Sequence, residues 1–128
     1  MHASRLCSAL FATALMLACA SGYAVAADCE RAIAAAMTVA DYGRRAFASN
    51  YQAEAANFAS DARIPAIDAA QQAKACGCPE AMPFLAEAAR DAARSNASAN
   101  GTAAQQYGAS IRKHSDAALD ALRRCASR

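Results

Sequence analysis

Alanine dominates the chain after its first 27 residues, where it occupies 32 of the 101 positions. In the same stretch only eight residues are Leu, Ile or Val, and a single one of them, Val39, is valine. Alanine has the highest helix propensity, whereas strands favour the β-branched and aromatic side chains that are scarce here. The sequence therefore predicts an all-α domain over 28–128, with a core built mainly of small side chains.

Apolar spacing and helix-breaking residues divide this domain into four predicted helices. The first begins after Asp28, and the second runs from Tyr51 to about Ala75. The expected buried face of the first helix consists of Ile33, Met37, Ala40 and Phe47. Ser49 and Gln52 have the spacing of a capping box at the start of the second helix.

The third helix is expected to begin at Pro79, a residue favoured at the first helical position, and to end near Arg94. Thr102 and Gln105 form another capping-box pattern, which opens the fourth helix. Its apolar face continues to Cys125. Four helices joined by short loops fold most simply as an antiparallel up-down-up-down bundle.

The four cysteines of the domain begin or end the predicted helices: Cys29, Cys76, Cys78 and Cys125. In an up-down-up-down bundle all four therefore lie at the same end. Three pairings are possible, and we favour Cys29 with Cys76 and Cys78 with Cys125, because each bond then joins two successive antiparallel helices. Such bonds would supplement a core too poor in large side chains to be stable through burial alone.

Two other roles remain open for the cysteine end. Four thiolates could hold zinc or copper(I) tetrahedrally, although an oxidising compartment disfavours free thiols. Cys76-Gly77-Cys78 could instead be a redox-active pair, but the sequence offers none of the strands on which thioredoxin-like redox motifs lie. We therefore expect structural disulfides, with no metal and no cofactor.

Residues 1–27 have the pattern of a cleavable secretory signal peptide. Arg5 precedes an apolar run over 6–20, and small residues over 24–27 suit a signal peptidase. The apolar run is shorter than the roughly 20 residues that a permanent membrane span needs. Cys19 could carry a lipid, but the bulky Leu17 and Met16 before it fit that reaction poorly. An uncleaved anchor is the remaining alternative, and we expect a periplasmic or secreted domain without stable membrane insertion.

A candidate ligand site is expected at mid-bundle. His114, the single histidine of the domain, falls at the same height as Asp41 and Arg44 once the cysteines fix the helix register. Pro65 on the second helix would kink that helix at this height and open space beside it. The alternative for His114 is a hydrogen-bonded boundary residue without a ligand.

No catalytic motif is present: the sequence lacks a Gly-x-Ser-x-Gly elbow, a phosphate loop, His-Glu-x-x-His and Cys-x-x-Cys-His. The 12 basic and 11 acidic residues after position 27 are scattered along the chain, which argues against nucleic acid as a partner. We expect a non-enzymatic module of the cell envelope that binds a protein partner. A metal or small-molecule binding protein and a thiol–disulfide protein are the alternatives.

The leader pattern generates a first prediction. N-terminal sequencing or intact mass of the protein purified from its native envelope should show a chain that begins at Ala27 or Asp28. The reason is that Ala24-Val25-Ala26-Ala27 places small residues immediately before either cleavage point, where the signal peptidase requires them. Retention of Met1, or a lipid on Cys19, would contradict cleavage at this site.

Overall fold

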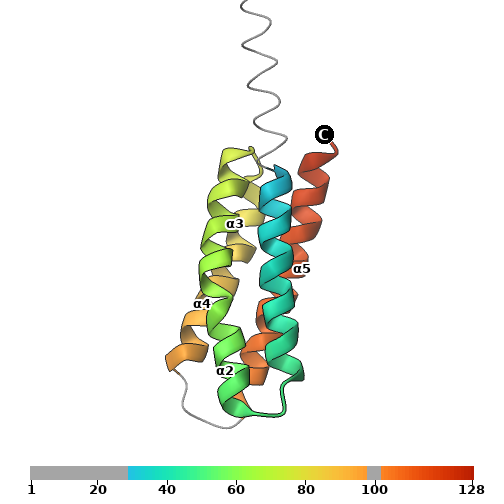
Figure 1. The fold of residues 1–128 in the computed structure, drawn as a ribbon. Helices are drawn as coiled ribbons and strands as arrows, with labels where there is room; N and C mark the ends of the chain where they lie inside the picture. Colours follow the sequence, from blue (N-terminus) through green and yellow to red (C-terminus); the bar gives the residue numbers. More distant parts are fainter. Residues whose placement is uncertain (1–28, 98–101) are drawn as a thin grey trace, which may run out of the picture.

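The structure is a computed structural model that describes residues 29–97 and 102–128. In this part of the chain, helices form four antiparallel rods with the C-terminus at the same end as residue 29 (Figure 1). The rods are the N-terminal helix over 29–48, α2 (Gln52–Asp61) with α3 (Arg63–Ala75), the 3₁₀ turn η1 (Pro79–Ala81) with α4 (Met82–Ala97), and α5 (Ala103–Ala126). The predicted all-α, up-down-up-down bundle is confirmed. The predicted signal peptide over 1–27 lies outside the described residues.

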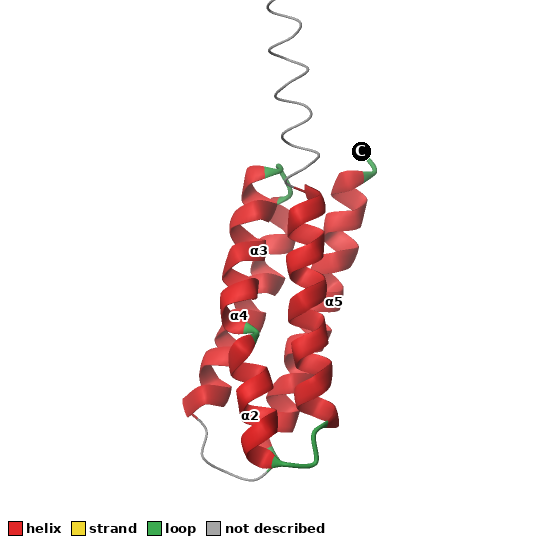
Figure 2. Cartoon of the chain, in the orientation of Figure 1, coloured by secondary structure: helices red, strands yellow, loops and turns green. Residues whose placement is uncertain are grey.

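The second rod is interrupted, and α2 and α3 meet at a short break that Figure 2 shows in green along the rod. At the break the amide of Ala62 donates to the carbonyl of Ala59 at 3.3 Å. Pro65 follows at the third position of α3, where a backbone N–H has no partner within its own helix, so the missing N–H costs α3 no hydrogen bond. The predicted kink at Pro65 therefore takes the form of a helix end four residues earlier, at Asp61.

The two predicted capping boxes are wrong. Neither Tyr51 before α2 nor Thr102 before α5 makes a side-chain capping hydrogen bond. The hydroxyl of Ser49 accepts instead from the amide of Tyr51 at 3.3 Å, a local turn within the loop. The side chain of Gln105 donates to the carbonyl of Ser49 at 3.4 Å and so connects the first turn of α5 to that loop.

Small side chains form most of the core, and the largest fully buried ones are Leu85, Ile111, Leu122 and Val39. The buried face of the N-terminal helix consists of Cys29, Ala32, Ala36, Val39, Gly43 and Ala46. The prediction that Met37 and Phe47 belong to this face is wrong, since they are 53% and 58% exposed. The prediction placed the largest apolar side chains on the buried face. In this helix the buried face is instead lined mainly by alanine.

The N-terminal helix and α5 come into backbone contact where Gly43 faces Gly108. A Cβ atom added at Gly43 would lie 2.8 Å from both the amide of Arg112 and the carbonyl of Gly108. A Cβ atom at Gly108 would lie 2.6 Å from that of Ala46 and 2.8 Å from the carbonyl of Gly43. Only glycine fits at either position at this helix separation.

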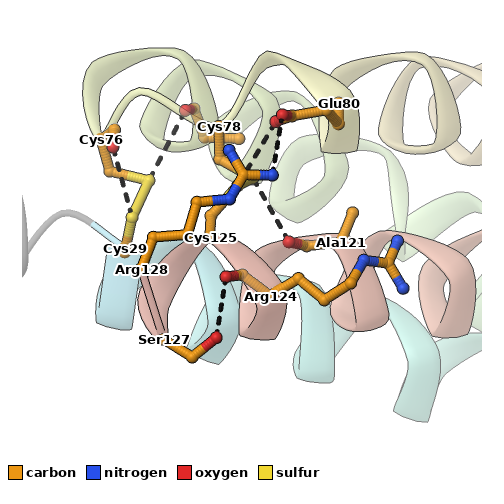
Figure 3. Close-up of a disulfide and its surroundings, with 10 residues drawn as sticks. Cys29, Cys76, Cys78, Glu80, Ala121, Arg124, Cys125, Ser127 and Arg128 are labelled. Atoms are coloured by element: carbon orange, nitrogen blue, oxygen red, sulfur yellow. Dashed lines mark hydrogen bonds and ion pairs between the residues drawn. A yellow bond between two sulfur atoms is a disulfide. The ribbon is translucent and has the colours of Figure 1, made fainter.

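Two disulfides join the rods at the end of the bundle where residue 29 lies (Figure 3). Cys29 is bonded to Cys76 and Cys78 to Cys125, with Cα–Cα distances of 5.1 and 5.8 Å. This is the favoured pairing, and each bond spans 47 residues. By loop-closure entropy each contributes roughly 4 kcal/mol. That is a large part of the about 5–15 kcal/mol by which a domain is stable.

Within the described residues, none of the helices has the length and hydropathy needed to cross a membrane.

The Gly43–Gly108 contact generates a second prediction. Gly108→Ala and Gly43→Ala should each lower the free energy of unfolding by about 1–3 kcal/mol, as overpacking does, because a backbone atom of the facing helix has to move. Thermal and urea unfolding followed by circular dichroism measure this. In a helix without such contacts the same change stabilises by about 1 kcal/mol. A stabilising result at either glycine would show that the two helices are not in contact there.

Candidate functional site

The cysteine end holds a small polar cluster around the Cys78–Cys125 bond. Glu80, at the start of the third rod, places a carboxylate oxygen 3.3 Å from the sulfur of Cys125. Arg128 reaches back from the C-terminus and donates to the other oxygen at 3.2 Å (Figure 3). A hydrogen bond from its own backbone amide, followed by the Arg128 guanidinium, holds the pKa of Glu80 below its usual value. Cys78, Glu80 and Cys125 have their ligand atoms within 4.8 Å of one another, as a metal site would require.

Both sulfurs of this cluster are consumed by the disulfide, so a metal could use them only after reduction. Cys76 and Cys78, the pair considered for redox chemistry, belong to different disulfides. The residues Cys29, Cys76 and Cys78 are buried. Because thiol exchange requires a thiolate to reach a sulfur atom, burial of both cysteines protects the Cys29–Cys76 bond, whereas the Cys78–Cys125 bond has one half-buried member, Cys125. The arrangement fits a structural clamp that holds all four rods at one end.

His114 lies at the seam between α4 and α5, where its side chain is 29% exposed. Its Nε2 atom is 3.7 Å from a carboxylate oxygen of Asp91, a residue of α4 that is only 5% exposed. The same oxygen accepts a hydrogen bond from the hydroxyl of Ser110 at 2.6 Å, and Arg94 contacts the other oxygen at 3.4 Å. Asp91 is therefore a buried acid with two hydrogen-bond donors, Ser110 of α5 and Arg94 of its own helix, and with His114 nearby.

This cluster has the residue types of a Ser-His-Asp triad but not its geometry. In a triad the histidine lies between the serine and the acid and removes the proton of the serine. Here the carboxylate of Asp91 lies between Ser110 and His114 and accepts from the serine directly. The arrangement suits interhelical pairing of buried polar groups rather than activation of a nucleophile.

Asp41 and Arg44 lie elsewhere. They line an open cavity of about 330 Å³ between the N-terminal helix and α5, together with Arg112 and Asp116 of α5. His114 is two residues from Arg112, which places it about 200° away around α5 at 3.6 residues per turn. The predicted grouping of Asp41, Arg44 and His114 in one pocket is therefore not what the structure shows. The three residues share a height in the bundle but lie on opposite sides of α5.

A second open cavity of about 360 Å³ continues the first along the same seam, and the two share Arg112 and Asp116. We call the combined surface the basic groove. It is lined by Met37, Ala40, Asp41, Arg44, Phe47, Ala109, Arg112, Lys113, Asp116, Leu119 and Arg123. The less exposed part of its lining includes Ala40, Ala109 and Leu119, whereas Met37 and Phe47 are more than half exposed.

The groove concentrates positive charge. Four of its residues are cationic (Arg44, Arg112, Lys113 and Arg123) and two are acidic, whereas the rest of the described chain has eight basic and eight acidic residues. The net positive charge of the described residues therefore lies entirely in the groove. The charges are scattered along the sequence, as expected, and the fold brings four of the twelve cations of the described chain to this groove.

Only part of this charge is neutralised locally. Asp41 pairs with Arg44 at 2.7 Å and with Arg45 at 2.8 Å, and the hydrogen bond from Arg44 is the main reason why the pKa of Asp41 is lowered. Arg112 is 3.8 Å from Asp116. Among the residues that the structure describes, neither Lys113 nor Arg123 contacts an acid. These two cations belong to different cavities of the groove and are the ones open to a ligand.

Sequence reasoning missed Asp91, Ser110 and the α5 side of the groove. A signal for the groove was present, since Arg112, Asp116, Leu119 and Arg123 follow helical spacing on one face of α5. A polar face of this kind is usually read as solvated surface. What could not be read from the chain is that the face adjoins the exposed Met37 and Phe47 of another helix.

Comparisons with protein-family models, curated proteins and solved structures find no match. The function therefore has to be inferred from the surface of the described residues. The sulfur atoms of the cysteine end are all bonded in disulfides, and Asp91 is buried between α4 and α5. The basic groove, in contrast, is open and combines unpaired cations with exposed apolar side chains.

The cysteine end generates a third prediction. The mature protein should show no reactive thiol in Ellman titration under native conditions, and no zinc or copper by elemental mass spectrometry. After reduction it should lose much of its helical circular dichroism at 37 °C, because two clamps of roughly 4 kcal/mol each are removed. Reactive thiols in the unreduced protein, or one equivalent of metal, would favour the metal-site alternative.

Proposed function

We propose that this chain is a small, exported, non-enzymatic binding protein of the cell envelope, which binds a protein partner through the basic groove. The observation that carries the proposal is the position of Met37 and Phe47. Both side chains are more than half exposed and line a groove that holds the net positive charge of the described chain. Exposed apolar side chains within a polar rim are typical of an interaction surface.

Burial of Met37 and Phe47 by a partner would contribute favourable free energy to binding, because both side chains are exposed to water in the folded monomer. A Phe or Met side chain gains about 1.5–3 kcal/mol when it is removed from water. Such anchors supply affinity, while surrounding charges supply specificity and speed of association. The groove has both components on one surface.

Export is supported by the two disulfides, which form and persist in oxidising compartments, and by the leader pattern over 1–27. These two features together support a periplasmic or secreted location. The non-enzymatic part of the proposal is supported by the cluster around Asp91, whose carboxylate is occupied by Ser110, His114 and Arg94. In that cluster the hydroxyl of Ser110 donates to the carboxylate of Asp91 and not to the imidazole of His114, so the serine is not activated as it is in a triad.

The proposal generates a fourth prediction, for a photo-crosslinking amino acid placed at Phe47 in the full chain and produced in its native cells. Irradiation should give a discrete adduct with one envelope protein, because position 47 lies in the groove. The same amino acid at Gln71, an exposed position of α3 away from the groove, is the matched control and should give none.

Charge reversal makes the crosslinking test specific. Lys113→Glu with Arg123→Glu should remove the adduct, since these changes reverse the two unpaired cations of the groove. Arg63→Glu with Lys74→Glu makes the same change in charge on α3, where neither residue lines the groove, and should leave the adduct intact. Equal crosslinking from positions 47 and 71, or an adduct insensitive to groove charge, would overturn the proposal.

A further inference from the structure

We propose that the partner inserts an acidic, amphipathic α-helix into the basic groove. This inference rests on the proposed function and specifies the chemistry of the partner. It is drawn from three properties of the groove: the distance between its unpaired cations, the spacing of its apolar side chains and the small residues on its floor.

The unpaired cations exclude a single small anion as the ligand of the whole groove. Lys113 and Arg123 are ten residues apart on one helix, which is about 15 Å at a rise of 1.5 Å per residue. One phosphate or carboxylate cannot contact both. A ligand that neutralises both needs acidic groups distributed over a similar length, as a peptide segment has.

The apolar side chains favour a helical segment. Met37 and Phe47 are also ten residues apart, on a helix that runs antiparallel to α5 (Figure 1). A partner helix presents side chains on one face at positions i, i+3, i+7 and i+11, which span about 16 Å. Its first and last apolar residues can therefore contact Met37 and Phe47 while acidic residues on its flanks reach Arg44, Lys113 and Arg123.

The floor of the groove allows a helix to approach. Ala40 and Ala109 line it, and below them Gly43 and Gly108 hold the two helices in backbone contact. Two closely spaced helices with small residues between them form a shallow channel into which the side-chain ridge of a third helix packs. An amphipathic helix in a groove is a recurrent mode of peptide recognition.

A peptide that binds as a β-strand is a poorer fit, because such ligands add a strand to a sheet edge and the described residues contain no strand. An anionic membrane is also a poorer fit. Helices that lie on a bilayer bury a large continuous apolar face, whereas the groove exposes only two large apolar side chains, Met37 and Phe47, ten residues apart. The membrane is nevertheless included as an outcome of the test.

The test uses the purified mature protein with both disulfides intact and a fluorescent synthetic peptide of about 18 residues, five turns of helix. The peptide carries Leu and Ala on one helical face and Glu on the other. A second peptide replaces every Glu with Lys, and a third scrambles the first so that composition is kept and amphipathicity is lost. Fluorescence anisotropy measures binding, and circular dichroism measures helix formation in the peptide.

The acidic amphipathic peptide should bind and become helical, and both control peptides should bind at least about tenfold more weakly, a difference of 1.4 kcal/mol. Lys113→Glu with Arg123→Glu, and separately Met37→Ala with Phe47→Ala, should each weaken binding of the acidic peptide by a similar factor. Arg63→Glu with Lys74→Glu should not. All four substituted groove positions are side chains at the surface, and thermal unfolding verifies that each variant is folded.

The inference is overturned if the lysine or scrambled peptide binds as well as the acidic one, or if the acidic peptide binds without becoming helical. It is also overturned if vesicles of anionic phosphatidylglycerol bind more tightly than any peptide with the same dependence on Lys113 and Arg123. A groove-specific adduct at position 47 with no binding of the acidic peptide would reject the helical, acidic partner and leave the proposed function standing. Loss of both results would reject the two together.

Discussion

The close approach of alanine-rich helices is the constraint on which the rest of this structure depends. At Gly43 and Gly108 the N-terminal helix and α5 are so near that a methyl group has no space, and along the other seams alanine occupies the contact positions. Close contact gives many small dispersion gains but buries little apolar area for each residue. Hydrophobic burial is correspondingly weak, which explains why two covalent bonds are placed at the end where all four rods meet.

The same constraint determines where the large apolar side chains go. Met37 and Phe47 lie outside the mainly alanine-lined contact face of the N-terminal helix, and both remain at the surface of a helix that is otherwise well packed. The neighbouring face of α5 is basic, and the seam between the two helices becomes the groove. The groove is therefore a consequence of how the core is packed.

The fold could be predicted from the sequence because helix propensity, cysteine placement and Pro79 all act locally or through simple topology. The pairing of Cys29 with Cys76 followed from the antiparallel order of neighbouring helices. The candidate site could not be predicted in the same way. Its position depends on how each helix is rotated about its own axis. A prediction based on side-chain size assigned Met37 and Phe47 to the buried face, but both are exposed. Register placed His114 and Asp41 at one height, but only the packed structure shows that α5 separates them and that Asp91 is the partner of His114.

Gly77 is the single residue between the two disulfides, and this gives the oxidised chain an unusual topology. With both bonds intact, even a fully unfolded molecule is a figure of eight: two rings, each closed by one bond, connected through Gly77. Each ring contains two successive rods of the bundle. The disulfide of that ring already holds the far ends of these two rods together, without any contact with the other ring. Loop closure, which ordinarily slows the formation of contacts distant in sequence, is already complete within each ring. What remains for folding is helix formation within the rings and the docking of one ring against the other.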